Sequence, residues 1–215
     1  SIPHKFTQKE DIEIEAFFAD TIAWGNRKSI ITNSNKLMLL MDNAPHSFVL
    51  NHSKKELNSF GSFVHRTFNG KDCIFFIESL KYIYKNKGGL EAAFRMTGGD
   101  NVKSRIVHFR KIFLETKHLA RTEIHISNPD TNSSSKRLCM FLRWMVRKDK
   151  KNVDFGLWKS ISPKELCLPL DVHTGNVSRA LGLLQRTQND WKAVEEITSV
   201  LKVRDANDPV KYVGA

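Results

Sequence analysis

The chain has 215 residues, a length that suits one compact domain or two small lobes. Its 34 Lys and Arg residues outnumber 23 Asp and Glu residues, and the resulting formal charge of +11 favours a polyanionic partner, most simply nucleic acid. No apolar run approaches the length of a membrane span, no signal peptide is visible and the three cysteines are widely spaced, so we expect a cytoplasmic monomer with no membrane partner, disulfide framework, metal or cofactor.

Apolar residues recur at helical spacing along almost the whole chain, and no convincing strand pair or repeat is present. Gly25 marks the end of the first helix, and the pair Gly88–Gly89 marks the end of the third. These patterns predict an all-α fold. In chain order, helices are expected over residues 11–26, 27–43, 70–89, 101–119, 136–148, the stretch that follows Asp171, and 189–202.

Two segments between the predicted helices carry clear local signals. The polar stretch NPDTNSSS, residues 128–135, is typical of a loop. In SISPKEL, residues 160–166, Ser162 is placed as an N-cap and Glu165 closes a capping box. Both segments fall within residues 128–184, the region on which the functional interpretation depends.

The helix predicted after the polar loop has two different sides on a helical wheel, at about 100° per residue. One side is apolar and anchors the helix, whereas the other is cationic. Arg143 and Arg147 on the cationic side either contact phosphates or form an ordinary solvated basic face. The apolar side comprises Leu138, Phe141, Leu142, Met145 and Val146, and the cationic side comprises Lys136, Met140, Arg143 and Arg147.

Lys136 differs from the other cations because it opens this helix directly after the loop. A lysine at that position lies near the positive end of the helix dipole, and its neighbour Arg137 adds a second positive charge. Both influences favour the neutral amine, which is the form needed for nucleophilic attack and Schiff-base formation.

The stretch LPLDVHTGNVSRALGLL, residues 168–184, places Asp171 at the start of another helix. The simplest role for an Asp at this position is that of an N-cap. A catalytic role is compatible with capping, because a capping carboxylate is held rigidly and stays ionised. His173 is favoured as a residue that orients Asp171 or packs under the loop, since no second ligand stands at metal-binding spacing from it.

Two of these stretches together resemble DNA glycosylases of the helix-hairpin-helix GPD superfamily, the endonuclease-three and 8-oxoguanine glycosylase branches above all. SSSKRLCMFL, residues 133–142, is similar to the segment that opens with the catalytic lysine of those enzymes. LPLDVHTGNVSRALGLL is similar to their aspartate segment. The chain also looks like a bacterial family of unassigned function, with IAWGNRKSI, LRWMVRKD and PLDVHTG as its recognisable segments.

The resemblance implies a two-lobed helical fold over residues 1–215, with a cleft between the lobes and a degenerate hairpin plus catalytic region at 128–184. Lys136 would be the Schiff-base lysine, Asp171 the invariant acid and His173 a supporting residue. The partner would be double-stranded DNA that carries a damaged base. Residues expected to contact the DNA are Asn26, Arg27, Ser134, Ser135, Arg137, Arg143 and Arg147.

The chain departs from the superfamily pattern in its hairpin and in one spacing. The hairpin should contain two glycines that let backbone amides approach a DNA phosphate, but the loop 128–135 has none. An insertion over residues 148–165 lengthens the spacing between Lys136 and Asp171. The absence of the cysteine cluster of the iron–sulfur branch favours the 8-oxoguanine side or a separate branch.

The sequence therefore favours a DNA base-excision glycosylase with abasic-site lyase activity, acting on an oxidised purine through a lysine Schiff base. The alternative is a non-catalytic nucleic-acid-binding protein on the same scaffold, because a fold does not guarantee its chemistry. Aromatic residues that either stack on an extruded base or belong to the core are Trp24, Phe141, Trp144 and Trp158.

Overall fold

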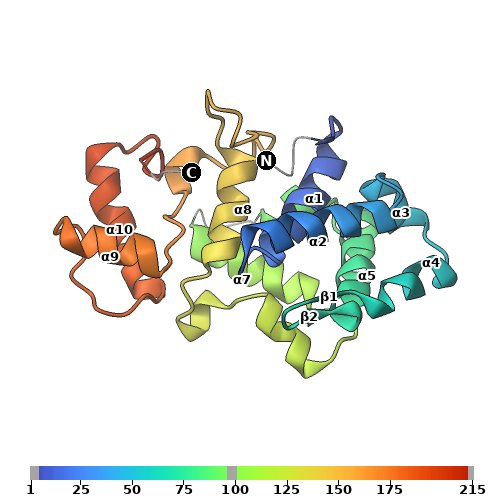
Figure 1. Ribbon diagram of the computed structural model, residues 1–215. Coiled ribbons are helices and arrows are strands. Elements are labelled where there is room, and N and C mark those ends of the chain that lie inside the picture. The colour runs from blue at the N-terminus through green and yellow to red at the C-terminus, as the bar shows by residue number, and fades with distance from the viewer. Residues whose placement is uncertain (1–4, 96–100, 213–215) are drawn as a thin grey trace. The chain divides into compact units, whose positions relative to one another are not determined.

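The computed structural model describes residues 5–95 and 101–212, and within these ranges the chain is mostly helical (Figure 1). The predicted all-α class is confirmed. The ends of the predicted unit 1–215 lie outside the described residues. No helix within the described ranges combines the length and apolar character needed to cross a membrane.

The first of two compact units comprises Ser1–Phe94 and Lys111–Ile126. Figure 1 shows its helices α1, α2, α3 and α5 side by side, and contacts join α1 to α2 and α3, and α3 to α5. Its core is aromatic, since the ring of Phe17 lies 5.7 Å from that of Phe76 and 5.6 Å from that of Phe113. The elements are α1 (Lys9–Thr21), α2 (Arg27–Leu40), α3 (Pro45–Asn51), α4 (Lys54–Asn58), η2 (Ser59–Ser62), β1 (Val64–His65), β2 (Phe68–Asn69), α5 (Gly70–Asn86), α6 (Leu90–Phe94) and η3 (Ala120–His125).

The antiparallel pair of β1 and β2 contradicts the expectation that no strand pair is present. Strands of two residues are too short to produce an alternating sequence pattern. The buried ring of His65 connects the pair to the turn after α1, since its Nε2 lies 3.1 Å from the carbonyl oxygen of Trp24. The register pairs Val64 with Asn69 and His65 with Phe68.

The second unit comprises Arg95–Arg110 and Ser127–Ala215. Buried apolar side chains of α8 and α10, such as Phe141 and Ile197, contribute to its core. Its elements are the first part of α7 (Val102–Phe113), η4 (Pro129–Thr131), α8 (Lys136–Val146), η5 (Pro163–Glu165), α9 (Val172–Ala180) and α10 (Trp191–Arg204).

The predicted helices are found, with ends that differ by up to six residues, as at the C-terminus of α7. α1 ends at Thr21, and Gly25 lies in the following turn with a φ of +100°. The capping box of Ser162 and Glu165 is confirmed, although it begins a short 3-10 turn. The short helices α3, α4 and α6 were not predicted, because segments of five to seven residues contain too few turns for a clear period.

Candidate active site

The N-terminus of α8 places Lys136 directly after a strained residue. Ser135, the residue before the helix, has a φ of 47° and a ψ of 40°, which is the left-handed region. A non-glycine residue in this region costs roughly 1–2 kcal/mol, and such residues are frequent at functional sites. Lys136 is the first residue of α8, as predicted.

Asp171 is the N-cap of α9, as the sequence indicated. Its backbone is extended, and its Oδ1 accepts a hydrogen bond of 2.8 Å from the backbone N–H of Thr174. Partial burial by itself would raise the pKa of the Asp171 carboxyl. Hydrogen bonds from Thr174 and the nearby Lys136 outweigh burial and hold that pKa below its usual range. Asp171 is therefore ionised at neutral pH.

The structure brings Lys136 and Asp171 together although 35 positions separate them in the chain. The distance from Lys136 Nζ to Asp171 Oδ2 is 3.2 Å, and the two side chains are 37% and 40% exposed. This exposure leaves both groups accessible to a substrate. Nucleophilic attack by Lys136 uses the unprotonated amine, and Asp171 is the base that contacts its Nζ.

The loop before Lys136 adopts a tight turn without glycine. Asn132 has a φ of 67° and a ψ of 22°. Asn tolerates the left-handed region better than most residues, so it takes a conformation for which glycine is the usual choice. The segment in front of this turn is the 3-10 turn η4, not an α-helix.

The other predicted DNA contacts in the loop differ in exposure. Ser135 is only 2% exposed, and its hydroxyl has no hydrogen-bond partner among the described residues. Ser134 and Arg137 are half-buried. The burial of Ser135 makes Ser134 the more accessible hydroxyl, and the DNA contacts of these residues stay predictions.

The two arginines of the cationic side are engaged inside the protein. Arg143 is 4% exposed, and its Nε donates to Asp154 Oδ2 over 3.2 Å. Arg147 donates to the same oxygen over 2.7 Å and to Asp208 Oδ1 over 3.0 Å. These contacts give Arg143 and Arg147 a structural role that neither alternative from the sequence included. The carboxylate that gathers them, Asp154, lies in the insertion 148–165.

His173 is exposed in the first turn of α9. Its ring makes no hydrogen bond, ion pair or ring contact with another residue in the described ranges. It therefore does not orient Asp171 through a direct bond here, and its supporting role stays a prediction. Within the described residues, no three His, Cys, Asp or Glu side chains gather as metal ligands.

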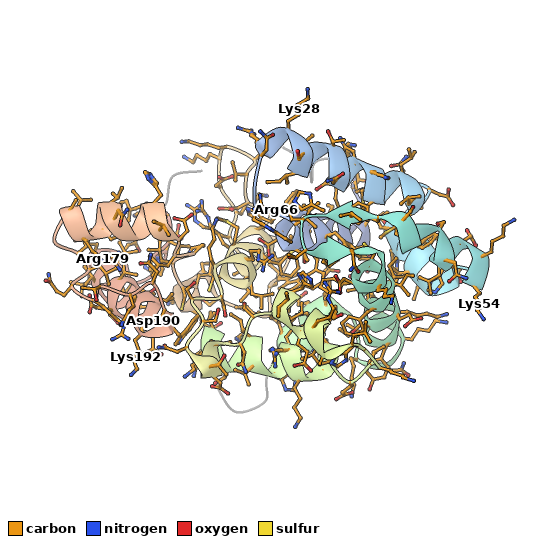
Figure 2. The ribbon with its side chains drawn as sticks, turned by 60° about the horizontal axis from the view of Figure 1, so that its bottom comes forward. Lys28, Lys54, Arg66, Arg179, Asp190 and Lys192 are labelled. Atoms are coloured by element: carbon orange, nitrogen blue, oxygen red, sulfur yellow. The ribbon has the colours of Figure 1, made fainter. Side chains whose placement is uncertain are left out.

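Asn26 and Arg27 lie in the first unit, at the start of α2. Asn26 is the N-cap, and its Oδ1 accepts from the backbone N–H of Lys28 over 2.8 Å. The β1–β2 turn adds a cation, Arg66, that the sequence did not reveal. Arg66 packs against Gly25, because a Cβ at Gly25 would lie only 2.8 Å from Arg66 Nη1. Figure 2 shows Lys28 pointing away from α2. The turn at Gly25 and the β1–β2 turn thus form one exposed cationic surface.

The candidate base-stacking residues divide by burial. Phe141 and Trp158 are fully buried, with ring centroids 5.4 Å apart, so the core alternative applies to both. Trp24 is half-buried, and its ring makes an edge contact with the ring of His65 at 5.3 Å. Trp144 is half-buried.

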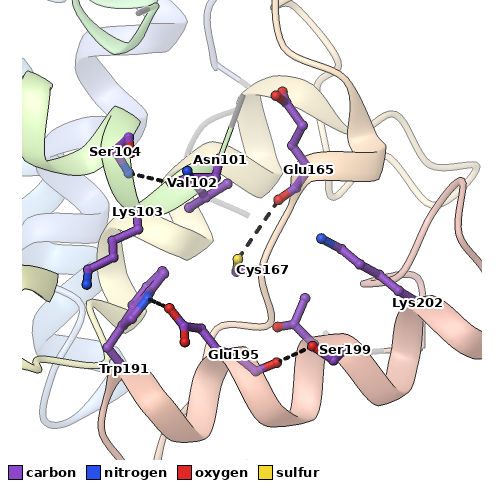
Figure 3. A pocket seen from close by; sticks show the side chains of 11 residues that line it. Asn101, Val102, Lys103, Ser104, Glu165, Cys167, Trp191, Glu195, Ser199 and Lys202 are labelled. Carbon is purple, nitrogen blue, oxygen red and sulfur yellow. Dashed lines mark hydrogen bonds between the residues drawn. The ribbon is translucent and has the colours of Figure 1, made fainter. Parts of the chain in front are cut away.

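A separate pocket of about 370 Å³ lies in the second unit between the start of α7, residues 165–167 and α10 (Figure 3). Neither Lys136 nor Asp171 lines it. Trp191 Nε1 donates to Glu195 Oε1 over 2.7 Å at its wall. Burial raises the pKa of the Cys167 thiol to about 11, so this sulfur is a poor nucleophile at neutral pH.

Comparison with known proteins gives a family but no activity. No curated protein and no solved structure matches the chain. A match to the family described as "Protein of unknown function (DUF2400)" covers residues 1–213, and the chain therefore belongs to this family.

Proposed function

We propose that this protein is a DNA base-excision glycosylase with abasic-site lyase activity, in which Lys136 is the nucleophile and Asp171 the acid–base partner. The observation that carries the proposal is the 3.2 Å contact between Lys136 Nζ and Asp171 Oδ2, at a place where both side chains remain two-fifths exposed. An ion pair this exposed contributes little to the stability of the fold. A pair that reacts with a substrate must be exposed, because the substrate has to reach it.

Electrostatics supports a DNA partner. The net charge of +11 attracts a polyanion, and the exposed cations Arg27, Lys28 and Arg66 gather at one surface of the first unit. Phosphate contacts of this kind fix the position of a duplex without reading its sequence. The damaged base, an oxidised purine, is extruded from the stack before reaction.

The chemistry begins with removal of one proton from the Lys136 ammonium by Asp171. The amine then attacks C1′ of the damaged nucleotide, the bond from C1′ to the base breaks, and the base leaves with the proton that Asp171 holds. The regenerated carboxylate of Asp171 stabilises the positive charge that develops on the sugar.

Strand cleavage follows from the adduct on C1′. The amine loses its remaining extra proton, the C1′–O4′ bond breaks with proton transfer to O4′, and a protonated Schiff base forms. The carboxylate of Asp171 then takes a proton from C2′, the C3′–O bond breaks, and the 3′ phosphate leaves with the electron pair of that bond. Hydrolysis of the Schiff base by water returns the Lys136 amine.

Borohydride trapping tests the proposal directly. The protein is incubated with a duplex that carries 8-oxoguanine or an abasic site, and the adduct is measured after reduction. We expect a covalent adduct that disappears in Lys136→Ala. Lys150→Ala is the matched control, because Lys150 is exposed and makes no ion pair or hydrogen bond within the described residues. Tight DNA binding without any adduct contradicts the proposal, and retained trapping in Lys136→Ala identifies a different nucleophile.

A second candidate is a non-catalytic nucleic-acid-binding protein. The observation in its favour is the state of the loop 128–135, since the amide of Asn132 donates to Asp190 over 2.9 Å and the hydroxyl of Ser135 is buried. An amide that is already bonded to Asp190 and a hydroxyl that is buried do not grip a phosphate. The same experiment separates the candidates, because this protein would bind DNA and give no adduct.

A further inference from the structure

The glycine-free loop before Lys136 is fastened to the start of α10. Asn132 Nδ2 donates to Asp190 Oδ2 over 2.9 Å, and the backbone N–H of Trp191 donates to the carbonyl oxygen of Asn132 over 3.2 Å. An antiparallel bridge joins the next residue, Ser133, to Asp190. Two consecutive loop residues, Asn132 and Ser133, therefore hold the loop to the start of α10 shortly before Lys136.

Asp190 is itself rigidly held. It is the N-cap of α10, where its Oδ1 accepts from the backbone N–H of Ala193 over 3.1 Å. Arg186 donates to both of its oxygens, over 2.7 and 2.5 Å. The Arg186 guanidinium beside Asp190 holds the pKa of that carboxyl well below its usual range. Asp190 stays ionised, so the contact with Asn132 persists throughout the neutral and mildly acidic range.

The same chain segment, residues 185–190, also holds α9. Figure 2 shows Arg179 on α9 and Asp190 at the start of α10. Arg179 donates to the carbonyl oxygen of Arg186 over 2.7 Å and to Asn189 Oδ1 over 2.7 Å. Gly175 packs so closely that a Cβ there would lie 2.5 Å from Asn189 Oδ1.

Lys136 and Asp171 each lie four residues along the chain from a residue that contacts segment 185–190. Lys136 lies four residues after Asn132 in the sequence. Asp171 lies four residues before Gly175, whose backbone N–H donates to the carbonyl oxygen of Asp171 over 2.8 Å. A shift of segment 185–190 relative to either attachment would change the distance between the amine and the carboxylate.

We propose that segment 185–190 sets the separation of Lys136 and Asp171, with Asn132 and Asp190 as positioning residues. The catalytic part of this inference rests on the proposed function. Misplacement of a reacting group by about 1 Å is able to reduce a rate by about 10²-fold, so small movements of the segment should have large effects on the reaction.

The test compares two substitutions at Asn132. Asn132→Ala removes the amide and disfavours the left-handed backbone, whereas Asn132→Gly removes only the amide. We expect Asn132→Ala to lower the trapping rate at saturating abasic duplex by about 10- to 100-fold, with the Kd for the duplex little changed. Asn132→Gly should recover part of that loss. Asp190→Asn, which keeps the cap but weakens the pairing with Arg186, should also lower the rate.

A control variant separates positioning from general instability. Asp208→Asn removes a carboxylate that pairs with Arg147 in the same unit and does not touch segment 185–190. It should lower the unfolding temperature and leave the trapping rate and its pH profile unchanged. A trapping rate in folded Asn132→Ala equal to that of the original protein would overturn the inference, as would a loss of rate in Asp208→Asn of the same size.

A measurement without DNA distinguishes this inference from the proposed function. Reductive methylation with formaldehyde and cyanoborohydride, followed by peptide mass spectrometry, reports the reactivity of the Lys136 amine. We expect faster labelling of Lys136 in Asn132→Ala than in the original protein, with unchanged labelling of Lys150. If the original protein traps no DNA, the proposed function fails while the labelling still decides the positioning role. Unchanged labelling of Lys136 in the folded variant contradicts that role.

Discussion

The two ends of α8 carry the same kind of pair, a cation against a carboxylate, in opposite surroundings. At the C-terminal end Asp154 is buried and accepts from Arg143 and Arg147. At the N-terminal end Lys136 and Asp171 are both about two-fifths exposed. A charged group in a buried pair is separated from its partner only at a high desolvation penalty. A charged group in an exposed pair exchanges its partner for substrate or water at small cost. Burial, and not residue type, therefore separates the structural end of this helix from the end available for chemistry.

The largest effect on stability is expected at the buried end. Asp154→Ala should lower the free energy of unfolding by about 3–5 kcal/mol, because it leaves the buried guanidinium of Arg143 without this carboxylate. Urea denaturation followed by circular dichroism measures the change. Asp208→Ala is the matched comparison, since Asp208 pairs with Arg147 but is more exposed. Equal losses in the two variants would show that burial does not control the effect.

The next largest effect on stability is expected in α9, the helix that Asp171 caps. Gly175→Ala should destabilise the protein by about 1–3 kcal/mol, because the new Cβ would lie 2.5 Å from Asn189 Oδ1 and 2.8 Å from Arg179 Nη1. Gly61→Ala is the control, because a Cβ there meets no atom within 4 Å. Thermal unfolding of both variants gives the comparison. A gain of stability in Gly175→Ala, as expected for Ala in an unhindered helix, would contradict the close packing.

The sequence predicts the all-α class, the main helices and the caps at Asp171 and Ser162, because these depend on local periodicity and local hydrogen bonds. The resemblance to the glycosylase superfamily also pointed to Lys136 and Asp171 as a pair. The roles of Arg143 and Arg147 were not predictable, since a helical wheel shows which side is basic but not that Asp154 and Asp208 meet that side. The burial of Arg143 and the partial burial of Arg147 depend on contacts with carboxylates from other segments.

The loop 128–135 shows a second limit of the sequence. The missing glycines indicated a weakened hairpin, yet Asn132 adopts the left-handed conformation. The signal that was available is the tolerance of Asn for this region. The signal that was not available is Asp190, which lies 58 residues later and holds the Asn132 side chain.

A smaller loss is expected at the carboxylate of the exposed pair. Asp171→Ala should lower stability by about 0.5–2 kcal/mol because α9 loses its N-cap, and Asp171→Asn should lower it less because Asn also caps helices. The folded-state pKa of Asp171 lies below its unfolded value, so its contribution is present above the unfolded pKa and is lost as pH falls through the folded pKa. The free energy of unfolding should be measured from pH 7 down to pH 3 for the original protein and for Asp171→Ala. The difference between the two proteins should become smaller in acid. A constant difference over this range would contradict the lowered pKa.

The smallest effect on stability and the largest on chemistry are expected together at Lys136. Lys136→Ala should change the free energy of unfolding by less than about 1 kcal/mol, because an exposed pair contributes little and Asp171 keeps its bond from Thr174. Lys136→Arg preserves a cation beside Asp171 but has no amine able to form a Schiff base. We expect both variants to fold and bind duplex DNA, and neither to be trapped by borohydride. If Lys136→Ala instead destabilises the protein as much as Asp154→Ala does, the two ends of α8 serve the same structural purpose and the distinction drawn from their exposure is wrong.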